Sequence, residues 1–319
     1  MTALQDRVTD LGLTGRDFLT VHDYAPAEVV ALLDLAGELK AAQKSAQPHV
    51  LLAGKAVGMI FTKTSTRTRI SFEVGIAQLG AQPLYLNAND IQLRIGETMR
   101  DTGHVLSRFL DAIMIRTYAQ ADVVDLAASA TIPIINGLTD DHHPCQAMAD
   151  ALTVKEHCGG LEGRKLVYSG DGNNVAHSLA EVGAKTGMHV VICTPDDFRP
   201  SEEIIARARA DAAETGATIE LTNDLHQAVV GADVIYTDTF TSMGQESEHD
   251  VRLAALRDYQ VNDELLALAG PQVHVMHCLP AHWGEEITES ALYSPQSVVF
   301  DQAENRLHAQ KAVMAALIG

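Results

Sequence analysis

The residues between positions 62 and 69 combine hydroxyl and basic side chains in a pattern suited to binding phosphate. The run Thr-Lys-Thr-Ser-Thr-Arg-Thr-Arg follows a predicted strand and opens a predicted helix. Ser65, Thr66 and Thr68 supply hydroxyls, and a helix N-terminus supplies free N–H groups. The guanidinium of Arg67 adds a planar, charged donor. We therefore expect a tetrahedral oxyanion to bind here, the alternative being an ordinary Ser/Thr-capped helix with solvated arginines.

The segment His-Pro-Cys-Gln at 143–146 follows another predicted strand and begins another predicted helix. His143 offers a donor near neutral pH, and the amide of Gln146 both donates and accepts. These groups suit a planar ligand that carries a carbonyl and an amine. A purely structural His-Pro helix start is the alternative. His142 and His143 lack the spacing of a metal site.

The run Gly-Asp-Gly-Asn-Asn-Val at 170–175 lies where a dinucleotide-binding fingerprint would lie, between a predicted strand and a predicted helix. Val175 stands where that fingerprint has its third glycine, so the sequence does not predict a dinucleotide site. Asn174 is left as a polar group at a helix N-terminus that could bind a carboxylate. It could equally be a turn amide bonded to its own backbone.

Asp238 and Cys278 each end a predicted strand in the second half of the chain. Asp238 is soon followed by Ser-Met-Gly at 242–244, and Cys278 lies in His-Cys-Leu-Pro at 277–280. Ligands of open α/β sheets bind outside the carboxyl ends of the strands, so both positions point to one cleft. An acidic residue there would hold an ammonium group. Cys278 could instead be a buried small hydrophobe.

Short apolar runs alternate with segments of helical period along the chain, which predicts parallel sheets covered by helices. The predicted strands span residues 56–61, 83–87, 112–116, 132–136, 165–170, 189–195, 218–222, 234–238 and 273–278. The predicted helices span residues 26–44, 67–80, 97–110, 120–130, 145–157, 174–187, 201–215, 224–231 and 303–318. The stretch 239–261 has no clear period and is long for a connection, so it is a candidate lid.

Length and composition narrow the class of protein. A chain of 319 residues is long enough for about two domains. Its 23 basic and 42 acidic residues give a net charge of −19, which disfavours nucleic acid and anionic membranes as partners. The four cysteines have no metal-finger spacing, no apolar run approaches about 18 residues, and the N-terminus lacks a targeting pattern. We therefore expect a cytoplasmic protein with reduced cysteines.

Five motifs occur in order along the chain: Ser-Thr-Arg-Thr-Arg at 65–69, His-Pro-Cys-Gln at 143–146, Asp238, Ser-Met-Gly at 242–244 and His-Cys-Leu-Pro at 277–280. Together they resemble the aspartate/ornithine carbamoyltransferase family, and its ornithine-specific members most. The similarity extends from Gly15 to the closing helix that contains Arg306. The resemblance implies an α/β fold of two doubly wound parallel-sheet domains joined by interdomain helices.

The resemblance further implies that each domain binds a different substrate. Residues 1–147 would form a carbamoyl phosphate domain, completed by a C-terminal helix at 304–319 that packs back on it, and residues 148–303 an ornithine domain. The implied reaction transfers the carbamoyl group of carbamoyl phosphate to the δ-amine of L-ornithine, giving L-citrulline and phosphate. The implied assembly is a homotrimer or a multiple of trimers, with no metal and no organic cofactor. The same site would serve arginine biosynthesis and the reverse, arginine-degrading direction.

Individual residues take roles from the same resemblance. Those implied to bind carbamoyl phosphate are Ser65, Thr66, Arg67, Thr68, Gln92, Arg116, His143, Gln146, Cys278, Leu279 and Arg306, with Gln92 reaching the phosphate from a neighbouring subunit. Those implied to bind ornithine are Asn174, Asp238, Ser242 and the Met243 backbone. The implied catalytic residues are Arg67, Arg116, His143, Asp238, Cys278 and Arg306.

The identity of the acceptor substrate is the part of this interpretation for which alternatives exist. An aspartate-specific enzyme would need extra cationic groups for a dicarboxylate, whereas this chain has Asp238 and Ser-Met-Gly. Putrescine and N-acylated ornithine are closer alternatives, although Ser-Met-Gly favours a free α-amino acid. Many relatives carry a basic residue soon after His-Cys-Leu-Pro, but here the run is Ala-His-Trp-Gly at 281–284. We expect Trp283 to pack near the candidate lid.

Overall fold

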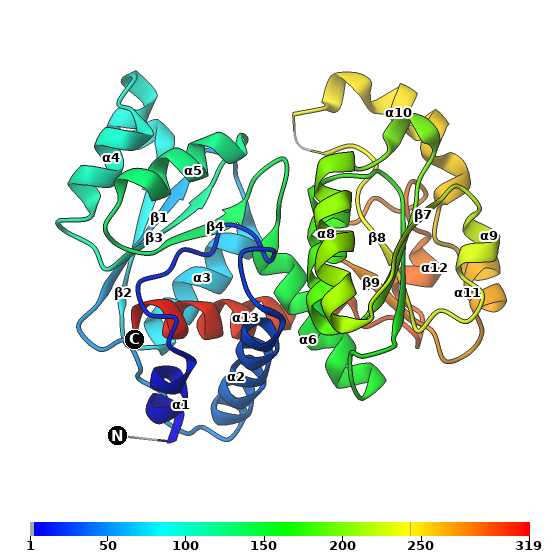
Figure 1. Cartoon of the computed structure of the whole chain (residues 1–319). Coiled ribbons are helices and arrows are strands. Elements are labelled where there is room, and N and C mark those ends of the chain that lie inside the picture. The colour runs from blue at the N-terminus through cyan, green and yellow to red at the C-terminus, as the bar shows by residue number, and fades with distance from the viewer. Residues whose placement is uncertain (1–2, 243) are drawn as a thin grey trace. The chain divides into compact units, whose positions relative to one another are not determined.

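Two parallel sheets organise the part of the chain that the computed structural model describes, residues 3–242 and 244–319 (Figure 1). They belong to two units, the first comprising Met1–Leu152 with Glu304–Gly319 and the second Thr153–Ala303. Helices α6 (Pro144–Cys158) and α13 (Val299–Ile318) each begin in one unit and end in the other. The predicted fold class, two parallel-sheet α/β domains, is confirmed.

The sheet of the first unit has the strand order β2-β1-β3-β4. Its strands are β1 (Ala56–Phe61), β2 (Gln82–Asn87), β3 (Ala112–Arg116) and β4 (Ile134–Leu138). Strands β3 and β4 are buried along their whole length, whereas the edge strand β2 is partly exposed. Ile60, Ile113 and Ile134 share one apolar cluster with Val123 and Leu126. Such continuous apolar runs are typical of a parallel sheet with both faces covered.

The strand order of the first unit reverses between β1 and β3. Strand β1 continues through α3 (Thr66–Gln78) to β2 on one side, and β3 continues through α5 (Gln120–Ser129) to β4 on the other. The register pairs Phe61 with Arg116, so the β1–α3 turn and the end of β3 emerge next to each other. This switch point is where open α/β sheets bind ligands.

The remaining helices of the first unit are α1 (Ala3–Leu11), α2 (Pro26–Lys44) and α4 (Met99–Leu106), with α13 added from the end of the chain. Gly75 of α3 lets α13 approach closely, because a Cβ there would lie 3.2 Å from Cγ of Lys311. Lys311 is fully buried, and its Nζ donates to the side-chain carbonyls of Gln43 (2.7 Å) and Gln78 (3.0 Å). Polar contacts as well as apolar packing therefore fix α13 in the first unit.

The sheet of the second unit has the order β7-β6-β5-β8-β9. Its strands are β5 (Lys165–Ser169), β6 (His189–Cys193), β7 (Ile219–Thr222), β8 (Val234–Thr237) and β9 (His274–His277). The order reverses between β5 and β8, where Ser169 pairs with Thr237. The next pair along, Thr237 with His277, sets the ends of β8 and β9 beside each other. The second unit thus has its own switch point.

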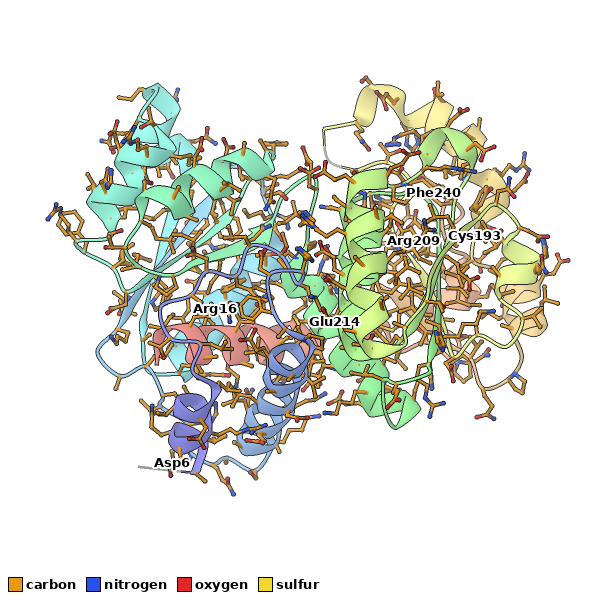
Figure 2. The ribbon with its side chains drawn as sticks, viewed as in Figure 1. Asp6, Arg16, Cys193, Arg209, Glu214 and Phe240 are labelled. Atoms are coloured by element: carbon orange, nitrogen blue, oxygen red, sulfur yellow. The ribbon has the colours of Figure 1, made fainter. Side chains whose placement is uncertain are left out.

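The helices of the second unit are α7 (Asn174–Thr186), α8 (Glu202–Thr215), α9 (Leu225–Ala228), α10 (His249–Leu256), α11 (Asp263–Ala269) and α12 (Glu289–Leu292). Side chains fill the space around the sheet, and Cys193 and Phe240 belong to its buried apolar cluster (Figure 2). In the described residues, no helix combines the length and the apolar character needed to cross a membrane.

The largest departure from the predicted elements lies in the stretch 239–261. It was expected to be an irregular lid, but it contains α10 and two short 3₁₀ turns. The residues that α10 buries are Arg252 and Leu256. Because one of the buried positions carries a charged side chain, the sequence lacks the apolar periodicity from which a helix is predicted. The fourth strand also begins two residues later than predicted, after Pro133, which lacks an N–H for the ladder.

Candidate active site

The turn between β1 and α3 forms the helix start expected to bind an oxyanion. Ser65 is the N-cap of α3, with an extended backbone and a side-chain oxygen that accepts from the N–H of Thr68 at 3.2 Å. The Ser/Thr helix cap, the alternative to an oxyanion site, is therefore present. It does not compete with an anion, since the remaining N–H groups and the positive end of the helix dipole stay at the same place.

The hydroxyl of Thr68 is the meeting point of two guanidinium groups. Nη1 of Arg116, at the end of β3, lies 3.4 Å from Thr68 Oγ1, and Nη2 of Arg306, on α13, lies 3.1 Å from the same oxygen. All three residues are buried. The structure thus brings together residues 68, 116 and 306, which are far apart in the sequence, within the first unit.

Arg306 also fixes the amide of Gln146. Nη1 of Arg306 donates to Oε1 of Gln146 at 2.6 Å, and Nε2 of Gln146 donates to Asp150 at 2.8 Å. The carbonyl of Gln146 therefore faces the guanidinium, and its NH₂ group faces a carboxylate. A carbonyl oxygen can accept two hydrogen bonds, so Gln146 can still accept from an amide N–H of a ligand.

The charge around His143 is strongly positive. Burial lowers the pKa of His143 well below its ordinary value of 6.5, and the nearby cations Arg306, Arg116, Arg67 and Lys63 lower it further. The imidazole is therefore neutral near pH 7, which leaves it one N–H to donate. A dianionic ligand would be attracted by the same cations.

Lys63 belongs to this positive region, although its function was not predicted from the sequence. Its side chain is buried, and its Nζ lies 2.7 Å from Asp140 and 4.6 Å from the ring centre of Tyr118. Gln92, in contrast, lies exposed on a 3₁₀ turn (Gln92–Ile95). Its implied role, in which it reaches the phosphate from a neighbouring subunit, stays a prediction.

In the second unit, Asp238 is the centre of the polar groups at the switch point. Its Oδ2 accepts from Nδ2 of Asn173 at 2.8 Å. Its Oδ1 accepts from the N–H of Thr239 and lies 2.8 Å from the thiol of Cys278. The predicted proximity of Asp238 and Cys278 is present because β8 and β9 are neighbours in register.

Asn173 contacts Asp238, a contact that was not predicted from the sequence. It caps α7, since its Oδ1 accepts from the N–H groups of Val175 (2.9 Å) and Ala176 (3.3 Å). The expected residue, Asn174, is the first residue of the helix and is also buried. Two successive asparagines made the cap ambiguous, although the preference of N-caps for Asn was the signal available.

Asp171 and Arg252 form a buried ion pair beside Asp238. Nη2 of Arg252, on α10, lies 3.0 Å from Oδ2 of Asp171 in the β5–α7 turn. Burial raises the pKa of Asp171 to about 6, Arg252 opposes the shift, and Asp238 and Glu248 add to it. This pair ties α10 to the turn that carries Asn173.

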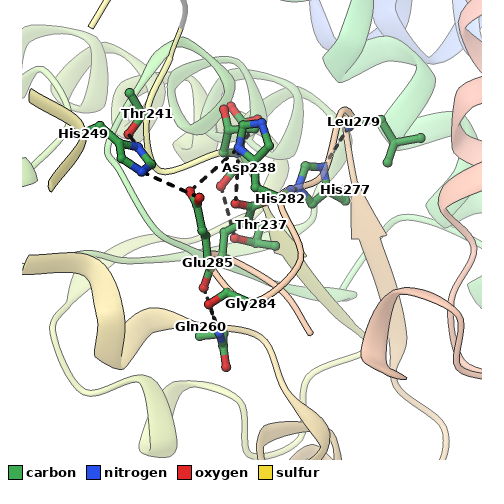
Figure 3. A network of polar contacts seen from close by, with 12 residues as sticks. Thr237, Asp238, Thr241, His249, Gln260, His277, Leu279, His282, Gly284 and Glu285 are labelled. Atoms are coloured by element: carbon green, nitrogen blue, oxygen red, sulfur yellow. Dashed lines mark hydrogen bonds and ion pairs between the residues drawn. The ribbon is translucent and has the colours of Figure 1, made fainter. Parts of the chain in front are cut away.

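The loop after β9 carries Cys278 and Leu279. Leu279 has a left-handed backbone (φ 57°), and its N–H donates to Nδ1 of His277 at 2.8 Å (Figure 3). Asp238, His277 and Cys278 each place a possible metal-ligand atom within 4.8 Å of the others. Both ring nitrogens of His277 are already hydrogen-bonded, so it is poorly suited to hold a metal.

The Ser-Met-Gly segment at 242–244 is described only in part. Ser242 is half-buried, and its N–H donates to Oε1 of Gln245 at 3.2 Å. Met243, implied to bind ornithine, lies outside the described residues. Trp283, expected near this segment, is 55% exposed and packs edge-on against Tyr293, with ring centres 5.9 Å apart. The next residues along, Gly284 and Glu285, contact the stretch 239–261 through Gln260 and His249, and the packing of Trp283 itself near the candidate lid stays a prediction.

Family models match both halves of the chain. The model for the carbamoyl-P binding domain of aspartate/ornithine carbamoyltransferase matches residues 16–156, and the model for the Asp/Orn binding domain matches residues 162–317.

Individual relatives agree with these models. The ornithine carbamoyltransferase of Pyrococcus abyssi is 55% identical over 309 residues, which cover 97% of this chain and 98% of the relative. The anabolic ornithine carbamoyltransferase of Pyrococcus furiosus is 54% identical with the same coverage. The solved structure of ornithine carbamoyltransferase from Pyrococcus furiosus matches with a TM-score of 0.93 at 55% identity, covering 96% of this chain and 98% of that one. The chain therefore belongs to the aspartate/ornithine carbamoyltransferase family.

Proposed function

We propose that this protein is an ornithine carbamoyltransferase, which joins the carbamoyl group of carbamoyl phosphate to the δ-amine of L-ornithine and releases L-citrulline and phosphate. The observation that carries the proposal is the identity of 54–55% over 97% of the chain to relatives of that name. The two switch points support it, because one collects cations around a helix start and the other collects groups for an amino acid.

The first unit binds carbamoyl phosphate in this proposal. The phosphate is held at the N-terminus of α3 by Ser65, Thr66, Arg67 and Thr68, with Gln92 supplied by a neighbouring subunit. Arg116 and neutral His143 polarise the carbamoyl carbonyl. Gln146, Arg306 and the carbonyl of Leu279 orient the carbamoyl amide. The shared contacts of Arg116 and Arg306 with Thr68 support a single binding place for the groups that the first unit supplies.

The second unit binds ornithine. Asp238 and Asn174 hold the α-amino and α-carboxylate groups, together with Ser242 and the Met243 backbone. Cys278 lies beside the δ-amine. The fixed hydrogen bonds of Asp238 to Asn173 and Thr239 support a preorganised carboxylate at this position.

The reaction requires the δ-amine to be neutral, although its pKa in water is close to the value of about 10.4 for lysine. A carboxylate such as Asp238 favours the ammonium form, whereas exclusion of water favours the free amine. The amine nitrogen attacks the carbamoyl carbon, a C–N bond forms, and the bond from that carbon to the phosphate oxygen breaks. The departing phosphate takes the proton. Arg67, Arg116 and His143 stabilise the developing oxyanion and the leaving group, each donor being typically worth about 3 kcal/mol.

Initial rates with four acceptors side by side test this function. Carbamoyl phosphate is supplied with ornithine, N-acetylornithine, putrescine or aspartate, and each carbamoylated product is measured. A strong preference for ornithine, with citrulline as the product, is expected. Preference for another acceptor would overturn the roles given to Asn174, Asp238 and Ser242, and turnover with none of them would overturn the function itself.

The direction, location and assembly are further parts of the proposal. The Pyrococcus furiosus relative is named an anabolic ornithine carbamoyltransferase, which supports a role in arginine biosynthesis. A cytoplasmic location stays a prediction. A homotrimer, or a multiple of trimers, is supported by exposed apolar side chains of the first unit, namely Ile70, Val74, Leu84, Tyr85 and Ile95. Light scattering should then give a mass at least three times the 34.3 kDa of one chain.

A further inference from the structure

Two buried side chains, His277 and Glu286, form hydrogen bonds that fix the loop carrying Cys278 and Leu279. Neither side chain exposes any surface. Nε2 of His277 lies 3.1 Å from Oε1 of Glu286. Neither residue has a role in the reaction described above.

The hydrogen bonds of His277 determine where its proton lies. Nδ1 accepts from the N–H of Leu279 at 2.8 Å, so Nδ1 carries no proton (Figure 3). The remaining N–H is on Nε2 and donates to Glu286. Leu279 has a φ of 57°, a left-handed conformation that is unfavourable for a non-glycine residue. The imidazole therefore supplies the acceptor for a backbone N–H in an unfavourable conformation.

Glu286 holds the other end of the same loop. Its Oε1 also accepts from the N–H of His282 at 2.5 Å. One carboxylate oxygen thus receives donors from both sides of residues 278–281. The backbone of Glu286 is itself fixed, because its carbonyl accepts from the N–H of Val261 at 2.9 Å.

The position of this loop decides where two proposed substrate contacts lie. The Cys278 thiol is 2.8 Å from Oδ1 of Asp238, and the Leu279 carbonyl is proposed to accept from the carbamoyl amide. We propose that Glu286, acting through His277, is a positioning residue that sets the direction of the Leu279 carbonyl and the place of the Cys278 thiol. This inference rests on the proposed function.

Stability alone does not account for the pair. Taking a carboxylate and an imidazole fully out of water is costly, and a well-packed apolar pair is often at least as stable. An apolar pair, however, would leave the Leu279 and His282 N–H groups without these acceptors. The polar pair is therefore explained by the loop conformation that it specifies.

Two ligands separate a positioning role from a general loss of structure. Inorganic phosphate offers only the group proposed to bind α3, whereas phosphonoacetamide offers a phosphonate and a terminal amide for the Leu279 carbonyl. Calorimetry measures both affinities in the wild type, Glu286→Leu, Glu286→Gln and the matched control Glu285→Leu. Citrulline formation gives kcat and KM for the same four proteins.

In Glu286→Leu, we expect phosphonoacetamide to bind at least about tenfold more weakly, with phosphate affinity changed by less than about twofold. The kcat for citrulline should fall by at least about tenfold. Glu286→Gln should restore most of both losses, because its side-chain carbonyl can accept from the same two N–H groups. Glu285→Leu should behave as the wild type. Equal weakening of both ligands, or an unchanged ratio, would overturn the inference.

A second variant keeps the inference testable where Glu286→Leu does not fold. In His277→Asn, the Asn Oδ1 replaces Nδ1 as the acceptor for Leu279, but no atom reaches Glu286. Selective weakening of phosphonoacetamide is again expected, and an unchanged ratio contradicts the role of Glu286. A wild type that makes no citrulline would instead overturn the proposed function, while the two-ligand comparison could still be made.

Discussion

The side-chain amide of Asn173 donates to Oδ2 of Asp238 at 2.8 Å, so the residue that caps α7 also holds the carboxylate at the end of β8. The two roles use different atoms of one amide. Oδ1 accepts from the helix N-terminus, which turns Nδ2 toward Asp238. The contact crosses the switch point between β5 and β8, where the register of Ser169 with Thr237 brings the two turns together.

Replacing Asn173 with serine should separate these two roles. Serine is nearly as good an N-cap as asparagine but has no amide to reach Asp238. A lost hydrogen bond to a charged group costs about 1.5–3 kcal/mol, so kcat/KM for ornithine should fall at least about tenfold. The thermal midpoint should stay close to that of the wild type. An unchanged kcat/KM in steady-state assays would show that Asp238 does not depend on Asn173.

Arg306→Lys tests the guanidinium that contacts both Gln146 and Thr68. Lysine keeps the charge but cannot hold two partners with a planar fork. We expect kcat to fall about a hundredfold, as for the loss of one preorganised donor. The matched control is Arg7→Lys, a surface arginine of α1 whose ion pairs are 3.8 Å long, which should leave kcat within about twofold. Near-normal turnover in Arg306→Lys would contradict the role of the fork.

Much of this arrangement follows from local sequence patterns. Apolar runs in the sequence predict the strands, and the rule that ligands bind at strand ends singles out Asp238 from the sequence alone. Two features could not be read in this way. The buried face of α10 carries Arg252, so the sequence has no apolar periodicity that would predict this helix. The contact of Arg306 with Thr68 joins residues 238 positions apart, and only the tertiary fold brings them together.

The ion pair of Asp171 with Arg252 should make ornithine binding depend on pH. The pKa of Asp171 is raised from 3.8 to about 6, so the carboxyl takes up a proton as the pH falls through 6. The protonated carboxyl loses its charge attraction to Arg252, which loosens α10 from the turn that carries Asn173. The KM for ornithine should therefore rise between pH 7 and pH 5.

Asp171→Asn checks this assignment. The variant should have a raised KM for ornithine at pH 7 and a flatter dependence on pH below it, because the titrating group is gone. Asp197→Asn, at an exposed position of the same unit, should keep the wild-type profile. Parallel profiles for wild type and Asp171→Asn would mean that another group is responsible.

Lys311 should make the stability of the protein rise with pH in the alkaline range. Its buried Nζ contacts Gln43 (2.7 Å), Gln78 (3.0 Å) and His49 (3.1 Å), none of which is a carboxylate. Burial lowers the pKa of Lys311 from 10.5 to about 8. Between these two values the unfolded chain binds a proton that the folded chain has released, so the free energy of unfolding increases with pH. From pH 7.5 to pH 9.5 the gain is roughly 2 kcal/mol.

Urea denaturation at these two pH values, under reducing conditions, measures the effect. Lys311→Met removes the titrating group, so the difference in unfolding free energy between wild type and variant should grow by roughly 2 kcal/mol from pH 7.5 to pH 9.5 in favour of the wild type. Lys44→Met, at an exposed lysine of α2, should keep the wild-type dependence. The direction matters, because a lysine whose pKa is raised on folding would instead lower the free energy of unfolding with rising pH, and only above its unfolded pKa of 10.5. A constant difference between wild type and Lys311→Met would show that Lys311 stays protonated in the folded protein up to pH 9.5.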